Sequence, residues 1–243
     1  MVISACLIAS CDNAPYLAQA IASVRAQTRP FDLIVVADDA STDGSREVIR
    51  SMAAEEPRLV PVLRDRRLGP AGNRDLAIRD MRADWISQLD GDDKMAPDKH
   101  AAEWEAIAPF QDRIEAVGFS DVLLVDAWGD PLECWNLARY ALMDRAERLT
   151  WMARRSAPIP RDMLLSRHLY LEAGGYDHAL PLYEDWDFKL RLAACRAVWR
   201  HSGITGTQYR RHGAGLSDAP LPEHELWLAS VRQRNAALMA GAV

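Results

Sequence analysis

The sequence has few cysteines and no long apolar run. Its four cysteines form no CxxC pair and no metal-ligand spacing. We therefore expect neither a disulfide framework nor a zinc site, and the pattern favours a reduced, cytoplasmic chain. No stretch approaches the roughly 20 apolar residues that a membrane helix requires. The run 8–11 resembles a lipoprotein cleavage site, but no Lys or Arg precedes it, so a strand is the better interpretation.

Two nucleotide-binding motifs and an excess of positive charge are also absent. The sequence contains neither a Walker motif nor GxGxxG, which argues against a P-loop and against a Rossmann dinucleotide site. The formal net charge of −6 argues against nucleic acid as the main partner. At 243 residues, with 49% hydrophobic and 26% charged residues, the chain otherwise has the composition of an ordinary globular protein.

Strand-like and helix-like patterns alternate through the first hundred residues. Strands are predicted at 2–9, 33–37, 59–63 and 85–89, and helices at 15–27, after 41–43, at 72–81 and at 97–107. This order predicts an α/β fold with a mostly parallel central sheet flanked by helices. Ligands bind beyond the carboxyl ends of such strands. Five acidic residues fall at that edge: Asp12, Asp38, Asp39, Asp90 and Asp92.

The pattern changes after residue 110. We expect one or two strands at 116–126, a turn at 128–131, arginine-rich helices within 139–167, a helix at 185–198, a strand at 203–209 and a last helix at about 223–239. No repeat or linker interrupts the chain. The sequence thus predicts a single domain over 1–243, with a nucleotide-binding half (1–110) and an acceptor-binding half (111–243). The last helix can contact a membrane surface or a second subunit, although docking onto the domain is favoured.

The run Asp90-Gly91-Asp92-Asp93 is the most informative segment. Its three carboxylates repel one another and directly follow a predicted buried strand. Mg²⁺ and Mn²⁺ prefer carboxylate oxygens and commonly bridge to phosphates, so the run predicts a cation site. A simple turn before a helix is the alternative. An EF-hand is excluded, because Met95 and Ala101 stand where glycine and glutamate are required.

Three further positions have both a functional and a structural interpretation. Glu184-Asp185 precedes a predicted helix, where acidic residues are common as caps, but a carboxylate there can also act as a general base. Arg74 can be a solvated helix residue or can bind a diphosphate. His212 can be a surface histidine in a basic loop or a ligand for a metal or a phosphate.

Taken in order, these pieces resemble family 2 inverting glycosyltransferases with the GT-A fold. The matching segments are Ser10-Cys11-Asp12-Asn13, 37–45, 69–75, 89–93, 174–177, Glu184-Asp185-Trp186-Asp187 and 209–212. Two positions depart from the family pattern, since Asp75 stands where asparagine is usual and Ser10-Cys11-Asp12-Asn13 where Thr-Tyr-Asn is commoner.

The resemblance implies a role for each matching residue. It implies that Asp185 is the catalytic base, that Glu184 and Trp186 lie on the acceptor side, and that Asp92, with Asp90 and His212, holds Mn²⁺ or Mg²⁺. The implied nucleotide-binding residues are Ser10, Asp12, Asp38, Asp39, Arg74 and Asp90, with the choice between Asp38 and Asp39 for the base left open.

The implied activity is transfer of a sugar from a nucleotide-diphosphate sugar, with UDP favoured, to a hydroxyl of a glycan or lipid-linked acceptor in polysaccharide biosynthesis. The enzyme would be cytoplasmic, with peripheral contact at the inner face of the membrane and a homodimer as open alternatives. Two other functions stay open, namely a non-catalytic nucleotide-sugar-binding subunit and a sugar nucleotidyltransferase. The latter would need a glycine-rich, basic loop after the first strand, and residues 10–15 contain none.

Overall fold

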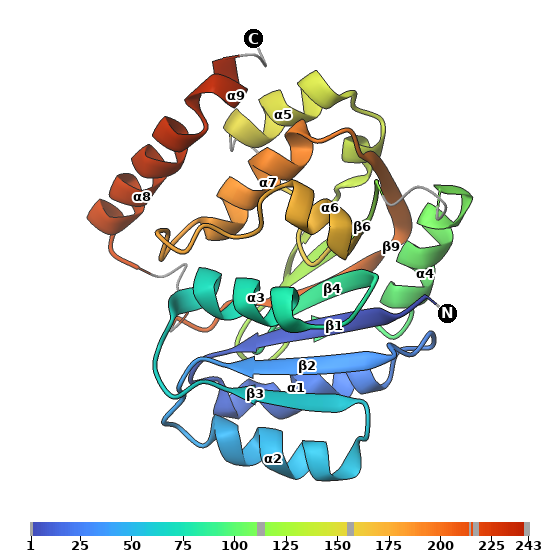
Figure 1. The fold of residues 1–243 in the computed structure, drawn as a ribbon, viewed down its shortest axis with the longest axis vertical. Helices are drawn as coiled ribbons and strands as arrows, with labels where there is room; N and C mark the ends of the chain where they lie inside the picture. The colour runs from blue at the N-terminus through green and yellow to red at the C-terminus, as the bar shows by residue number, and fades with distance from the viewer. Residues whose placement is uncertain (1, 111–114, 155–157, 214, 216–218, 241–243) are drawn as a thin grey trace.

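The computed structural model of the chain describes residues 2–110, 115–154, 158–213, 215 and 219–240. Within these ranges, nine strands form one sheet in the order β3-β2-β1-β4-β8-β6-β9-β5, with β7 paired to β6 (Figure 1). The strands are β1 Ser4–Ser10, β2 Leu33–Asp38, β3 Leu59–Leu63, β4 Trp85–Asp90, β5 Lys94–Met95, β6 Ala116–Val125, β7 Pro131–Trp135, β8 Leu164–Ser166 and β9 Val198–Arg210. The chain therefore has the α/β fold that the sequence predicted.

The first four strands pair in parallel, in agreement with the alternating sequence pattern. β1 lies between β2 and β4, and β2 lies beside β3. β1 is buried along nearly its whole length, which fits a strand covered on both faces. In the register, Ser10 lies opposite Asp38, and Ala9 lies opposite Asp90. The carboxyl ends of three strands thus meet at one edge of the sheet.

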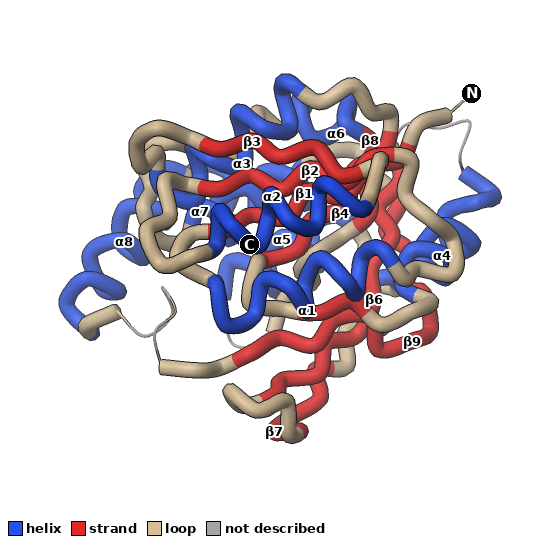
Figure 2. Tube along the Cα trace, turned by 90° about the horizontal axis from the view of Figure 1, so that it is seen from below, coloured by secondary structure: helices blue, strands red, loops and turns tan. Residues whose placement is uncertain are grey.

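Helices cover both faces of this sheet (Figures 1 and 2). On one face, Ile21 of α1 (Ala14–Arg25) and Ile49 of α2 (Ser45–Glu55) pack in a cluster with alternate residues of β1 and β2. On the other face, Ile78 of α3 (Gly69–Asp80) and Leu190 of α7 (Glu184–Ala194) belong to a larger cluster. The remaining helical segments are α4 Lys99–Ile107, η1 Ala108–Phe110, η2 Ala138–Ala141, α5 Arg145–Arg154, α6 Arg167–Glu172, α8 Leu221–Arg234 and α9 Ala236–Ala240.

The second half of the chain makes the sheet mixed. β8 lies antiparallel between β4 and β6, and β9 runs parallel to β6. The helical prediction for 139–167 is wrong at β8, since Leu164–Ser166 forms a strand. A strand of three residues is too short to show a period of two, so the sequence pattern could not reveal it.

The predicted helix at 185–198 ends four residues early, at Ala194. Cys195 has an extended backbone (φ −67°, ψ 158°), and Val198 instead begins β9 beside Ala116 of β6. The strand predicted at 203–209 therefore starts earlier and runs over 198–210. Pairing with β6 provides backbone hydrogen bonds for these residues, and this tertiary contact decides where the helix stops.

The last predicted helix is divided into α8 and α9 at Asn235. The side chain of Asn235 is 3% exposed and donates a hydrogen bond of 2.7 Å to Oδ1 of Asp187 on α7. Val231 is buried in the main core, so α8 docks onto the rest of the fold. Across the described ranges, none of the helices combines the length and the apolar character needed to cross a membrane. Both halves contribute strands to one sheet. That the chain is a single domain over 1–243 stays a prediction.

Candidate active site

The loop Asp90–Asp93 follows β4 and lies tightly against the end of β1. The backbone N–H of Gly91 donates a hydrogen bond of 2.8 Å to the carbonyl oxygen of Ala9. A Cβ at position 91 would lie 2.9 Å from Oδ1 of Asn13 and 3.1 Å from that carbonyl oxygen. Glycine is therefore required for this close approach, which fixes the aspartates on either side of it.

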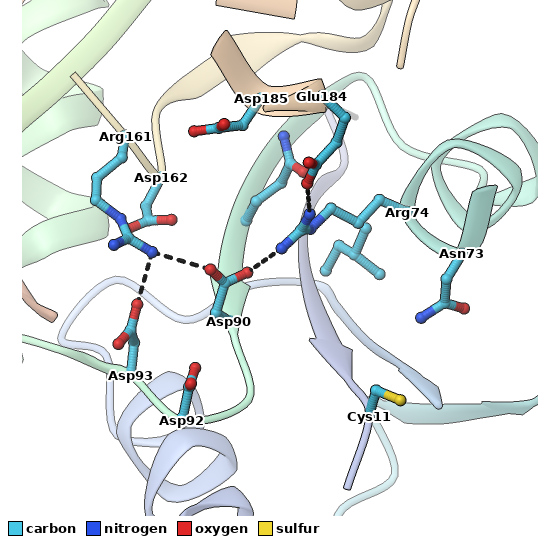
Figure 3. Close-up of polar contacts among 12 residues, drawn as sticks. Cys11, Asn73, Arg74, Asp90, Asp92, Asp93, Arg161, Asp162, Glu184 and Asp185 are labelled. Carbon is cyan, nitrogen blue, oxygen red and sulfur yellow. Dashed lines mark hydrogen bonds and ion pairs between the residues drawn. The ribbon is translucent and has the colours of Figure 1, made fainter. Parts of the chain in front are cut away.

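Three carboxylates gather in this loop, and their environments differ (Figure 3). One oxygen from each of Asp90, Asp92 and Asp93 lies within 4.8 Å of the others. Asp93 is buried and accepts hydrogen bonds from Nη2 of Arg161 (2.7 Å) and from the backbone of Arg210 (2.8 Å). Both oxygens of Asp93 are thus used inside the protein.

Asp92 is paired with His212 rather than with an arginine. Its Oδ2 lies 2.9 Å from Nε2 of His212, and its side chain is 20% exposed. The structure thus brings together Asp92, Asp90 and His212, although His212 follows Asp92 by 120 residues in the chain. Carboxylate oxygen and imidazole nitrogen are donors that Mn²⁺ accepts, and the carboxylates also suit Mg²⁺.

Arg74 of α3 joins the acidic loop to the start of α7. Its Nη2 lies 2.5 Å from Oδ1 of Asp90, and its Nη1 forms an ion pair with Glu184 (Figure 3). Burial acts to raise the pKa of Asp90, but the positive charges of Arg74 and Arg161 outweigh it and hold this pKa below its usual value. Burial raises the pKa of Glu184 to about 7, because Arg74 offsets it only in part.

Asp185 is the more accessible of the two carboxylates at the start of α7. Its side chain is 48% exposed, and its Oδ2 lies 2.6 Å from Nζ of Lys189, one turn further along the helix. Burial acts to raise the pKa of Asp185, but Lys189, with smaller effects of Arg74 and Arg161, lowers it to about 2. Asp185 is therefore ionised at neutral pH and open to a second molecule.

Trp186 lies elsewhere than expected. The resemblance implies a position on the acceptor side, whereas the side chain is 1% exposed, belongs to the main core and donates from Nε1 to the carbonyl oxygen of Met152 at 2.9 Å. The helical period explains this difference, because adjacent residues on a helix point in different directions, and the indole of Trp186 is directed at Met152 of α5. Trp186 packs α7 onto the fold and does not face the solvent beside Asp185.

Four of the expected nucleotide-binding residues lie at the ends of β1 and β2, namely Ser10, Asp12, Asp38 and Asp39. Asp12 accepts a hydrogen bond of 2.8 Å from the backbone of Thr42 and pairs with Arg67. Asp39 accepts hydrogen bonds from the backbone N–H groups of Leu68 (2.7 Å) and Gly69 (2.9 Å), at the start of α3. This arrangement links Asp39 to the helix that carries Arg74.

Ser10 and Asp38, like Asp39 (3% exposed), are buried. Asp38 is 0% exposed and pairs with Arg46 of α2 at 2.8 Å. Ser10 is 2% exposed, and its Oγ is buried with no hydrogen-bond partner among the described residues. Both lie at the correct edge of the sheet but are enclosed by protein in this structure.

Sequence reasoning missed Arg161 and Lys189. Arg161 precedes β8 and donates from Nη2 to Asp90 (3.0 Å) and Asp93 (2.7 Å). No local pattern marks Arg161, because the strand that brings it to the site was not predicted. Lys189 had a signal, since Asp and Lys four residues apart on a helix commonly pair.

Backbone strain is concentrated around this site. Within the part of the chain that the structure describes, the non-glycine residues with positive φ are Asp12, Ala40, Asp162 and Tyr183. Asp12 and Ala40 follow β1 and β2, Asp162 follows Arg161, and Tyr183 precedes Glu184. Such conformations persist only where the surrounding contacts enforce them, and they cluster at functional sites.

The candidate site thus combines the carboxyl-terminal edge of the parallel strands, an acidic loop after β4 and a half-exposed carboxylate at the start of α7. Residues 5–117 match the family model described as "Glycosyl transferase family 2". The match identifies residues 5–117 as a family 2 glycosyltransferase segment, and the mixed α/β sheet is that of the GT-A fold.

Named relatives agree with this assignment. The chain is 34% identical over 93 residues to the succinoglycan biosynthesis protein ExoO of Rhizobium meliloti, covering 38% of this chain and 26% of that protein. It is 28% identical over 118 residues to the putative teichuronic acid biosynthesis glycosyltransferase TuaG of Bacillus subtilis, covering 49% of this chain and 46% of that protein. This chain thus spans less than half the length of either relative.

A solved structure shows the same fold over nearly the whole chain. S. aureus TarS 1-349 in complex with UDP-GlcNAc superposes with a TM-score of 0.72 at 15% identity, covering 98% of this chain and 66% of that one. At this identity the likeness concerns the fold.

Proposed function

We propose that the chain is a metal-assisted, inverting glycosyltransferase with Asp185 as the general base. The observation that carries the proposal is the link through Arg74, which contacts both Asp90 of the acidic loop and Glu184 beside Asp185. This link brings an exposed, ionised carboxylate to the same site as a candidate cation and diphosphate site. A sugar between them would have its leaving group at the acidic loop and its attacking hydroxyl at Asp185.

The donor set at the acidic loop fits a divalent cation. Asp92 and His212 offer an oxygen and a nitrogen 2.9 Å apart, and Asp90 lies beside them in the acidic cluster. Both oxygens of Asp93 accept from Arg161 and Arg210, and both oxygens of Asp90 accept from Arg74 and Arg161, so Asp92 and His212 are the donors best placed for direct contact with the cation. A bound Mn²⁺ or Mg²⁺ would supply Lewis-acid stabilisation of the diphosphate leaving group.

The other residues of the site have complementary roles in this proposal. Asp185 accepts the proton of the acceptor hydroxyl as that oxygen attacks the anomeric carbon from the side opposite the diphosphate. Attack from that side inverts the anomeric configuration. Arg74 stabilises the negative charge that develops on the departing diphosphate, since a guanidinium suits phosphate oxygens.

A UDP-sugar is the proposed donor. The fold of this chain resembles that of TarS, which has been solved with UDP-GlcNAc, and this likeness supports a uridine nucleotide here. Asp38 and Asp39 stay alternatives for the base contact, because both are buried, Asp38 against Arg46 and Asp39 against the backbone of Leu68 and Gly69. The names of ExoO and TuaG refer to polysaccharide biosynthesis, which supports a glycan or lipid-linked acceptor.

The test combines binding and turnover. A thermal-shift panel of UDP, GDP and dTDP, with and without Mn²⁺, should give the largest rise for UDP with metal, since a ligand of the native state raises apparent stability. Incubation with UDP-sugars should then release UDP in an Asp185-dependent manner. Binding of UDP with no release from any donor would instead favour a non-catalytic nucleotide-sugar-binding subunit. The absence of any metal-dependent nucleotide shift would contradict the proposal.

A further inference from the structure

A buried ion pair lies on α4, between Lys99 and Glu103. Lys99 and Glu103 are 1% and 0% exposed, and Nζ of Lys99 lies 2.7 Å from Oε1 of Glu103. Ser120 of β6 donates a third polar contact, with its Oγ 2.7 Å from the same carboxylate. Burying two charges carries a large desolvation cost, and an apolar pair of similar volume often stabilises a fold as well or better.

The sheet is shaped to admit this pair. A Cβ on Gly206 of β9 would lie 2.5 Å from Oγ of Ser120 and 2.9 Å from Cγ of Lys99. A Cβ on Gly118 of β6 would lie 3.0 Å from the carbonyl oxygen of Glu103. Gly206 and Gly118 therefore leave the space that α4 needs beside Lys99 and Glu103. The ion pair is packed closely against both strands.

Lys99 has a second contact, which leads to the candidate active site. Its Nζ donates a hydrogen bond of 2.5 Å to the backbone carbonyl oxygen of Asp162. Asp162 has a left-handed backbone (φ +52°), a conformation that is strained in a residue other than glycine. Contacts such as the one from Lys99 are needed to keep the backbone in that conformation.

Asp162 in turn fixes the neighbouring Arg161. Nε of Arg161 lies 2.9 Å from Oδ2 of Asp162, and its guanidinium lies 3.9 Å from the ring centroid of Tyr209. The same guanidinium contacts Asp90 and Asp93 through Nη2 (Figure 3). A continuous chain of contacts thus connects Lys99 and Glu103 of α4 to the acidic loop.

We propose that Lys99 and Glu103 are positioning residues that hold the strained Asp162 backbone and thereby aim Arg161 at Asp90 and Asp93. Glu103 holds the ammonium group of Lys99 in place, and Lys99 in turn holds the carbonyl oxygen of Asp162. The consequence for donor binding rests on the proposed function, because it assumes that Asp90 and Asp92 bind a metal-nucleotide complex. The effect on the 161–162 segment does not depend on that assumption.

The central experiment compares two variants with different effects on stability. Lys99→Met leaves Glu103 buried without its partner and should destabilise the fold. The double variant Lys99→Met/Glu103→Leu removes both charges and should melt at or above the wild-type temperature. If the pair positions Arg161, both variants should lose Mn²⁺-dependent UDP affinity by roughly tenfold, the lower end of the loss seen for groups that hold a metal ligand directly.

A double-mutant cycle with Arg161→Ala separates positioning from general destabilisation. Lys99→Met should add little to the affinity loss of Arg161→Ala, because both changes interrupt one chain of contacts. Arg148→Met is the matched control: Arg148 is 5% exposed and donates to the carbonyl oxygen of Met143 at 2.7 Å, on α5. Its effect should add fully to that of Arg161→Ala. Full additivity of Lys99→Met with Arg161→Ala would overturn the proposal. Wild-type UDP affinity in Lys99→Met/Glu103→Leu would overturn it as well.

Amide hydrogen exchange of the free protein gives a readout without any ligand. Exchange across residues 158–166 should accelerate in Lys99→Met/Glu103→Leu and stay unchanged in Arg148→Met. If wild-type protein bound no nucleotide under any condition, the proposed function would fail, and this exchange measurement would still decide the positioning role. Unchanged exchange across residues 158–166 in Lys99→Met/Glu103→Leu would rule out the positioning role of the ion pair.

Discussion

The ammonium group of Lys189 lies 2.6 Å from Oδ2 of Asp185, one turn along α7. This contact lowers the pKa of Asp185 to about 2, so the proposed base is ionised throughout the neutral range but is a weak proton acceptor while paired. An acceptor hydroxyl that approaches Asp185 must share it with Lys189. The pair is therefore expected to set how the activity depends on pH.

Lys189→Met should move the acid limb of the pH–activity profile to higher pH. Without the ammonium, the pKa of Asp185 should rise from about 2 toward its ordinary range, so protonation would inactivate the base at a higher pH. The measurement is kcat/KM for sugar transfer between pH 3 and 8. Arg145→Met removes another cation, near the end of α7, where Arg145 donates to the carbonyl oxygen of Ala194, and should leave the limb in place. An unshifted limb in Lys189→Met would show that the pair does not control the titrating group.

Asp185→Asn should abolish transfer and preserve nucleotide binding. The amide keeps the shape of the side chain but cannot accept the proton, and loss of a general base typically costs about 10²–10⁴-fold in rate. Turnover should be measured by UDP release and the affinity for UDP with Mn²⁺ by calorimetry. Glu172→Gln, at an exposed position on α6, should match wild type in both. Near-normal turnover in Asp185→Asn would remove Asp185 from the role.

Asp92→Ala should weaken the metal-dependent part of UDP binding. Asp92 is the carboxylate of the acidic cluster that faces His212, and we expect an affinity loss of roughly tenfold or more with Mn²⁺ present. Calorimetric titrations with Mn²⁺ and with EDTA separate the metal-dependent and metal-independent parts. Glu105→Ala on the exposed side of α4 is the control. Equal affinities of wild type and Asp92→Ala in Mn²⁺ would argue against a cation at this position.

Glu184→Gln should change how stability depends on pH. The folded-state pKa of Glu184, about 7, lies above its ordinary value of 4.5. Such a carboxyl favours the folded state most below pH 4.5, and this contribution disappears as the pH rises through about 7. Wild-type stability should therefore fall relative to Glu184→Gln across this window, by at most about 3 kcal/mol. Urea unfolding at pH 4.5, 6 and 8 measures the difference, and a constant difference would contradict the assigned pKa.

Local patterns in the sequence were sufficient for the first half of the fold. Alternating apolar segments predicted the four parallel strands, and the position of Asp90 and Asp92 after the fourth predicted the edge where the acidic cluster lies. The resemblance to family 2 glycosyltransferases is confirmed by the family match over residues 5–117. The roles assigned to individual site residues remain predictions.

Other features were beyond the reach of local patterns. The burial of Trp186 and the short strand β8 depend on which surfaces meet in the fold. The same is true of the contacts of Arg161 with Asp90 and Asp93, which join residues about 70 positions apart. The pKa of Glu184 likewise depends on burial and on Arg74 from another helix.

The sequence by itself determined the element order of the first half and the placing of carboxylates after its strands, because periodicity and turn chemistry are encoded in neighbouring residues. Only the tertiary structure decided which charge faces which. Arg74 meets Glu184 across 110 positions, and Lys99 reaches the carbonyl oxygen of Asp162 across 63. Such pairings follow from the packing of distant elements, and the environment that tunes each carboxylate exists only once the chain has folded.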